Sequence, residues 1–327
     1  MAAAAGATEA AGYRPLLFSI AYGMTGSVGD AEDLVQDTFL NLTRAQRAGT
    51  TVTNLKAYLT TSVTRLGINH LGSARVRRES YVGEWLPEPV VAFAERPGDA
   101  PAEHAELADS LSMALLLMLE ALSPVERAVF LLREAFGYGY PEVAELTGKS
   151  EANCRQILAR ARKRLAAGDA QAPAPTARRA EGDELARRFF AVAAGGDLTQ
   201  LLDLLAPDVV FHGDGGGKAQ SVGRSVAGQE RVAQLLAFGF GRSRELGITL
   251  HPALVNGRPG AVSYDPQGRV TSVLELHIVD GAIRALHSVS NPDKLGHLGE
   301  VSDLGLRRVR ERQGASDNAP GLRIPFG

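Results

Sequence analysis

Hydrophobic residues recur at helical spacing through the first half of the chain and alternate at strand spacing through much of the second. The helical pattern predicts helices over 13–23, from Asp30 onward, over 54–73 and over 103–122, and then a helix pair within Tyr138–Leu165. The first half is therefore expected to form small all-α domains.

The pattern of the second half changes after a helix predicted over 183–206. Short apolar runs follow, and Asp280-Gly281 is a strong hairpin signal between two of them. The predicted strands are 209–211, 248–255, 260–264, 270–279 and 283–289. This half is expected to be α+β with a curved antiparallel sheet.

The stretch Tyr138–Leu165 has the pattern of a helix–turn–helix. Gly148 suits the turn, and Ser150 can cap the second helix through its hydroxyl oxygen. One stripe of that second helix is apolar and predicted to face a core: Cys154, Leu158, Ala161 and Leu165.

The opposite side of the second helix carries an amide, small residues and basic groups. This combination suits a recognition helix in a DNA major groove, because Gln and Arg read base edges and Lys meets phosphate. The alternative is an ordinary surface helix with a solvated basic face. The residues assigned to DNA contact are Ser150, Glu151, Asn153, Arg155, Gln156, Arg160, Arg162, Lys163 and Arg164.

A second basic cluster closes the helix predicted over 54–73. Basic, polar and aromatic groups on one helix fit a contact with single-stranded or melted DNA. The alternative is a basic helix end that complements the helix dipole. The residues assigned to this contact are Arg65, Asn69, His70, Arg75, Arg77 and Arg78.

The helix that starts near Asp30 has an acidic face carrying a leucine. Such a face is either solvated or a docking surface for a basic partner. Its residues are Asp33, Gln36, Asp37 and Leu40.

The formal net charge of −2 means that nucleic-acid binding must come from these local patches. Cys154 is the single cysteine, so no intramolecular disulfide can form. The N-terminus lacks the features of a signal peptide, and no apolar run reaches the length needed to span a membrane. We therefore expect a cytoplasmic protein with no membrane partner.

The first half resembles group IV, or extracytoplasmic-function (ECF), RNA polymerase sigma factors over about residues 11–167. One block is DAEDLVQDTFL, followed by LKAYLTTSVTRLGINHL and a run of arginines; the other runs from LSPVERAVF to the helix–turn–helix. The resemblance implies that the acidic face binds the β′ clamp of core RNA polymerase, and that the protein also contacts the β flap. It also implies that the two basic surfaces bind the minus-ten and minus-thirty-five elements of promoter DNA. Threonines occupy much of the DNA-melting helix, and Asn69 is our assignment for the residue that holds a flipped base.

Three further motifs, YVGEWLPEP, DGGGK at 214–218 and NPDKL at 291–295, are similar to the sigma-J-like subgroup. That resemblance implies a fused SnoaL-like cone that regulates the sigma domains in place of a separate anti-sigma protein. The residues assigned to this regulatory contact are Trp85, Leu86, Pro87, Asp214, Lys218, Asn291, Asp293 and Lys294, and the linker stretch of the contact runs from Trp85 to Pro89.

These patterns and resemblances divide the chain into six parts. The predicted parts are a region-two domain at 11–80, a Pro-rich linker at 81–109, a region-four domain at 110–167, a second linker at 168–182, the SnoaL-like domain at 183–295 and a tail at 296–327.

Other chemistry in the second half has weak support. Residues 214–218 fail the phosphate-loop pattern, because His212 and Ala219 stand where glycine and Ser or Thr are required. His212, Asp214 and His287 could approach one another as an acid–base site in an enzyme of the cyclase or isomerase type, but fold analogy alone does not establish catalysis. We expect no metal, no cofactor and no catalytic residue, and a pocket for an unknown small ligand stays open as an alternative.

Overall fold

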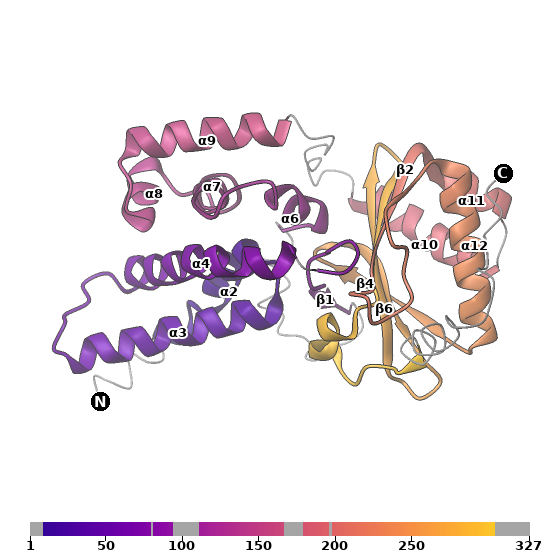
Figure 1. Cartoon of the computed structure of the whole chain (residues 1–327), viewed down its shortest axis with the longest axis horizontal. Helices are drawn as coiled ribbons and strands as arrows, with labels where there is room; N and C mark the ends of the chain where they lie inside the picture. Colours follow the sequence, from indigo (N-terminus) through magenta and orange to yellow (C-terminus); the bar gives the residue numbers. More distant parts are fainter. Residues whose placement is uncertain (1–8, 80, 94–110, 167–178, 196–197, 305–327) are drawn as a thin grey trace.

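The computed structural model describes residues 9–79, 81–93, 111–166, 179–195 and 198–304. A helical half and a sheet half lie side by side, and residues 81–93 run between them (Figure 1). Both expected fold classes are confirmed. No helix within these residues is long and apolar enough to cross a membrane.

Among the described residues, the first domain contains α2 (Arg14–Thr25), α3 (Val28–Arg47) and α4 (Leu55–Glu79). The predicted start of α3 at Asp30 is wrong, because Ser27 is the N-cap and its side chain accepts a hydrogen bond from the Asp30 N–H.

The second helical domain contains α6 (Met113–Leu119), α7 (Pro124–Phe130), a π-helical turn (Leu131–Ala135), α8 (Tyr140–Thr147) and α9 (Glu151–Ala166). Ser123 and Glu126 form the capping box at the start of α7. Of the helix predicted over 103–122, residues 103–110 lie outside the described residues.

The two helical domains share one hydrophobic core, to which α2, α3 and α4 contribute together with α6 to α9. Arg127 of α7 is buried in this junction and donates hydrogen bonds to the carbonyls of Met24, at 2.5 Å, and Leu119, at 3.1 Å. The helical half is therefore closed, with its second domain packed against its first.

The sheet half contains α10 (Arg179–Gly195), α11 (Leu198–Leu204), α12 (Gln229–Glu245) and a seven-stranded sheet of order β1-β4-β5-β6-β7-β2-β3. The strands are β1 (Val91–Ala92), β2 (Leu205–Asp214), β3 (Val226–Ala227), β4 (Thr249–Val255), β5 (Arg258–Tyr264), β6 (Val270–Val279) and β7 (Ala282–Val289). The expected all-antiparallel sheet needs one correction, since β2 and β7 pair in parallel.

The two faces of this sheet pack against different partners. Leu274 and Leu276 face a core shared with α10, α11 and α12, which cover one side of the sheet (Figure 1). Val273, one residue out of phase, faces a second core that includes Leu86 of the linker and Met113 of α6. The helical half therefore packs on the sheet face that α10 to α12 leave open.

Two predicted boundaries move. Helix α10 begins at Arg179, inside the stretch assigned to the second linker, 168–182. The stretch assigned to the tail begins with ordered residues: Glu300 O accepts from Val270 N, and Ser302 N donates to Val270 O, both at 2.8 Å. The described part of the sheet domain thus extends to residue 304.

Candidate nucleic-acid interface and linker site

Helix α9 has the two-sided character that its sequence predicts. The predicted inner stripe is buried, and the Ser150 hydroxyl accepts a hydrogen bond from Asn153 N at 3.3 Å. Gln156, Arg160 and Lys163 are exposed on the other side. Neither Arg160 nor Lys163 has an ion pair with another described residue. These side chains are therefore available to a ligand.

Three other arginines of α9 are already bound within the protein. Arg155 pairs with Glu151 at 2.9 Å, Arg162 pairs with Glu134 at 2.7 Å, and Arg164 pairs with Glu126 at 2.6 Å. Arg155 also lies over the ring of Tyr140, 4.7 Å from its centroid. These pairs hold the rim of the basic face in place around the residues that point outward.

A groove of about 680 Å³ runs beside α4, where contact with melted DNA is predicted. Tyr58, Arg65 and Asn69 line it together with Glu145 of α8. Arg65 Nη2 donates to the Glu145 carbonyl at 3.4 Å, so the second helical domain lies at the margin of the groove.

The threonines of α4 divide between core and groove. Thr60 and Thr64 are buried, whereas Thr61 lines the groove. His70 Nε2 lies 3.1 Å from Asp30 Oδ2, which directs this predicted contact residue toward α3. The backbone of α4 includes Arg75, Arg77 and Arg78, but their side chains lie outside the described residues.

The predicted acidic face of α3 is solvent-exposed at every assigned position: Asp33, Gln36, Asp37 and Leu40. Leu40 is 43% exposed and one of the few large apolar side chains on the described surface. Exposed acids around an accessible leucine fit a partner-binding surface.

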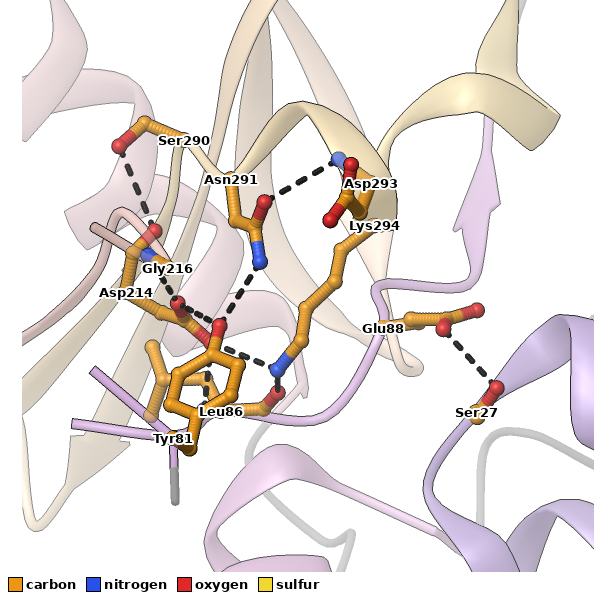
Figure 2. A network of polar contacts seen from close by, with 10 residues as sticks. All are labelled: Ser27, Tyr81, Leu86, Glu88, Asp214, Gly216, Ser290, Asn291, Asp293 and Lys294. Atoms are coloured by element: carbon orange, nitrogen blue, oxygen red, sulfur yellow. Dashed lines mark hydrogen bonds and ion pairs between the residues drawn. The ribbon is translucent and has the colours of Figure 1, made fainter. Parts of the chain in front are cut away.

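The linker docks on the open face of the sheet through Asp214, at the end of β2 (Figure 2). The carboxylate is fully buried and accepts from Leu86 N at 2.8 Å, from the Tyr81 hydroxyl at 2.5 Å and from Gly216 N at 3.0 Å. Because an extended segment bonds to it by backbone and side chain, Asp214 acts as the anchor for the linker.

Lys294 completes this anchor. Its Nζ lies 2.6 Å from Asp214 Oδ2 and donates to the Leu86 carbonyl. The ammonium also lies over the rings of Trp85, at 4.3 Å, and Tyr81, at 4.9 Å. Burial and the neighbouring Asp214 carboxylate raise the pKa of Tyr81, so its hydroxyl stays protonated as a donor.

Two glycines allow the linker to approach closely. A Cβ on Gly217, where φ is +69°, would lie 2.9 Å from Val82 Cγ1. A Cβ on Gly26, the C-cap of α2, where φ is +65°, would lie 2.8 Å from Trp85 Cη2. Trp85 is thus packed between Lys294 and the first helical domain.

Other predicted members of the contact have less direct roles. Asn291 donates to the Tyr81 hydroxyl at 2.8 Å and caps Asp293 N at 3.1 Å. Lys218 and Asp293 form an exposed ion pair with each other at 2.5 Å, within the sheet domain. These two side chains therefore do not reach the linker through that pair.

The opposite side of the linker binds the first helical domain through Glu88. Its carboxylate accepts from Ser27 Oγ at 2.9 Å (Figure 2) and from Val28 N at 2.7 Å, at the N-terminus of α3. Its backbone N donates to Gly26 O at 2.8 Å. Leu86 and Glu88, two residues apart, thus join different domains.

A row of titratable side chains continues the docking surface. His212 Nδ1 lies 2.6 Å from Glu84 Oε1 of the linker, and its ring stacks on His287 with centroids 5.1 Å apart. His287 in turn bonds to Glu275. The predicted approach of His212 and His287 is therefore observed, but on the sheet face that binds the linker. No cluster of three or more potential metal ligands was found among the described residues.

The sequence prediction missed several residues of this site, namely Tyr22, Tyr81, Glu84 and Asn256. Tyr81 and Glu84 lie within the quoted YVGEWLPEP motif, so the motif itself was an available signal. Tyr22 lies in an ordinary apolar helix pattern, which gives no sign of a distant polar partner.

Comparison with known proteins agrees with this architecture. The family models "Sigma-70 region 2", "Sigma-70, region 4" and "SnoaL-like domain" match residues 10–77, 112–165 and 186–285, respectively. The ECF RNA polymerase sigma factor SigJ of Mycobacterium tuberculosis (strain ATCC 25618 / H37Rv) is 38% identical over 86% of this chain and 90% of its own. A probable ECF sigma factor, SigI, of Mycobacterium tuberculosis (strain CDC 1551 / Oshkosh) is 31% identical over 88% of this chain and 93% of its own.

Comparison with solved structures agrees with the sequence comparison. The crystal structure of Mycobacterium tuberculosis SigJ matches with a TM-score of 0.69 and 35% identity, covering 89% of this chain and 98% of that one. The buried α9 stripe, the exposed basic face and the sheet domain docked through the linker thus occur in a chain related to SigJ along most of its length. The chain belongs to the ECF RNA polymerase sigma factors, which are not enzymes, and carries a SnoaL-like domain behind its two sigma regions.

Proposed function

We propose that this sigma factor directs core RNA polymerase to a two-part promoter and that its SnoaL-like domain controls this activity in cis. In this proposal the exposed face of α3 binds the β′ clamp, and region four makes the further contact with the β flap. Gln156 and Arg160 on α9 read base edges of the minus-thirty-five element, and Lys163 contacts phosphate. The groove beside α4 receives the minus-ten strand, with Asn69 at its edge.

The observation that carries regulation in cis is the double attachment of the linker. Leu86 is bound to the SnoaL-like domain through Asp214 and Lys294, and Glu88 is bound to region two through the start of α3. One short segment therefore links the position of region two to that of the SnoaL-like domain.

The close packing of the two sigma regions is incompatible with simultaneous binding of both promoter elements. The positions that name the minus-ten and minus-thirty-five elements differ by about 25 base pairs, which is roughly 85 Å of B-DNA at 3.4 Å per pair. In the closed arrangement, Arg65 of the minus-ten surface touches Glu145 of region four. The two regions must therefore separate before one promoter can occupy both surfaces, and the SnoaL-like domain binds both regions in the closed state.

Co-purification with core polymerase tests the sigma role. We expect the full chain to be retained by core polymerase and Asp37→Lys to be lost, since that exposed residue lies on the proposed docking face. Glu230→Lys, exposed on α12 of the SnoaL-like domain, is the matched charge reversal and should bind as the wild type does. If the full chain is not retained, it regulates transcription, if at all, without polymerase.

A further inference from the structure

The hairpin turn between β4 and β5 is buried in the junction between the SnoaL-like domain and both sigma regions. Val255 and Arg258 are the last paired residues, so Asn256 and Gly257 form a two-residue loop. Their φ angles of +49° and +68° are both left-handed, as a type I′ turn requires. Polar turn residues ordinarily face water, yet Asn256 is 0% exposed.

The Asn256 side chain forms hydrogen bonds with three other segments. Its Nδ2 donates to the Tyr22 hydroxyl of α2 at 2.8 Å and to the Leu111 carbonyl at 3.0 Å. Its Oδ1 accepts from Val90 N of the linker at 3.1 Å, and its backbone N donates to Val90 O at 2.8 Å. Leu111 directly precedes the stretch that matches region four. One side chain therefore contacts region two, the linker and the entry to region four.

Tyr22 connects Asn256 to Glu88 of the linker. Its side chain is fully buried in α2, and its hydroxyl donates to the Glu88 carbonyl at 2.6 Å while accepting from Asn256. Desolvation raises the pKa of Tyr22, so the phenol remains a neutral donor. Asn256, Tyr22 and Glu88 thus form a chain of hydrogen bonds across three parts of the protein.

An asparagine is the residue that fits this position. It tolerates a left-handed φ, and its amide supplies two donor hydrogens and an acceptor oxygen from a short side chain. Aspartate would lack the donors, and glycine would keep the turn while removing all side-chain contacts.

We propose that Asn256 is a positioning residue that locks region two, the linker and the start of region four together in the closed sigma factor. The lock is separate from the Asp214–Lys294 anchor, which holds the linker alone. The effect of this lock on promoter binding rests on the proposed function. If the two sigma regions must separate to bind a promoter, the β4–β5 turn must be released first.

Amide hydrogen exchange at Glu88 in the full chain tests this lock. Glu88 N donates to Gly26 O of region two, and Asn256 does not touch that bond, so its exchange reports linker release even when release is rare. Asn256→Gly should accelerate this exchange about tenfold or more, because it leaves buried donors and acceptors without partners. The matched control is Asp280→Gly, at φ +50° before Gly281 in the exposed β6–β7 turn, which should leave the rate unchanged.

Tyr22→Phe supplies the second variant, since it removes only the hydroxyl and keeps the ring. It should accelerate exchange at Glu88 in the same way, and it decides the question if Asn256→Gly does not fold. Wild-type exchange at Glu88 in the folded variants would overturn the lock. Because the measurement uses neither DNA nor polymerase, its failure is distinguishable from failure of the proposed function.

Discussion

Asp214 and Lys294 form an ion pair in which both side chains are almost completely removed from water, with Nζ 2.6 Å from Oδ2. The pair is not isolated, because the backbone of Leu86 binds both partners. A buried pair stabilises only when further hydrogen bonds satisfy its remaining donors and acceptors. Here the linker supplies those bonds, so linker docking and the stability of the pair depend on each other.

Lys294→Met should weaken linker docking strongly. The substitution leaves the Asp214 carboxylate buried without its counter-charge, which costs roughly 3–5 kcal/mol. The free energy of unfolding from urea denaturation gives this value. Lys218→Met is the control, since its pair with Asp293 is exposed and should contribute less than about 1 kcal/mol. Equal losses for the two variants would contradict the assigned roles.

Substitutions on α9 should separate base reading from phosphate binding. Arg160→Ala should cost about 1–3 kcal/mol of binding free energy on the cognate promoter and little on random DNA, whereas Lys163→Ala should weaken both. Fluorescence anisotropy with duplexes of either kind measures the difference. If Arg160→Ala weakens all duplexes equally, the helix makes only phosphate contacts.

Alanine substitutions at two glycines three residues apart should have opposite effects. Gly26→Ala places a Cβ 2.8 Å from Trp85 at a left-handed φ, so we expect a loss of about 1 kcal/mol or more. Gly29→Ala lies in the first turn of α3, where a Cβ would be 4.0 Å from its nearest neighbour, Ser27 Oγ, and should gain up to about 1 kcal/mol from helix propensity. Thermal unfolding measures both, and a stabilising Gly26→Ala would contradict the placement of Trp85.

Stability should fall as pH falls from about 7 toward 5, in part because of His277. Burial lowers the pKa of this imidazole, against the opposing charge of Glu275. His277 therefore takes up a proton near pH 6.5 in the unfolded chain but only at lower pH in the folded chain. Protonation between these two pH values stabilises the unfolded state relative to the folded state.

Replacing His277 should make that pH dependence shallower. His277→Gln removes the titrating group, and urea unfolding at about pH 5 and about pH 7.5 measures the change. His251→Gln, on an exposed position of β4, is the control and should keep the wild-type slope. An unchanged slope in His277→Gln would contradict this assignment.

The local elements of the sigma regions could be predicted because they follow from nearby residues. The α9 stripe and the Ser150 cap are set by helical periodicity and by side chains a few positions apart. Residues joined across the chain left no such pattern: Tyr22 and Asn256 are 234 residues apart. The same limit applies to the parallel pairing of β2 with β7, since the sequence of a strand does not determine which strand it pairs with.

Motif resemblance predicted part of the linker site, and the structure shows which of the predicted residues contact the linker. Asp214, Lys294 and Leu86 form the anchor, whereas Lys218 and Asp293 lie in the same motifs but pair with each other in solvent. Glu84 and Glu88 both lie in the quoted YVGEWLPEP motif, but the motif does not indicate which partner each acid binds. Their roles appear only when the linker is placed against His212 and the start of α3.

Promoter-directed transcription with purified core polymerase tests the central claim, that this sigma factor is controlled in cis through linker docking. We predict a promoter-specific transcript with the wild-type chain, and an output changed at least about fivefold by Lys294→Met but not by Lys218→Met. No specific transcript from the wild-type chain, or equal outputs from wild type and Lys294→Met, would contradict it.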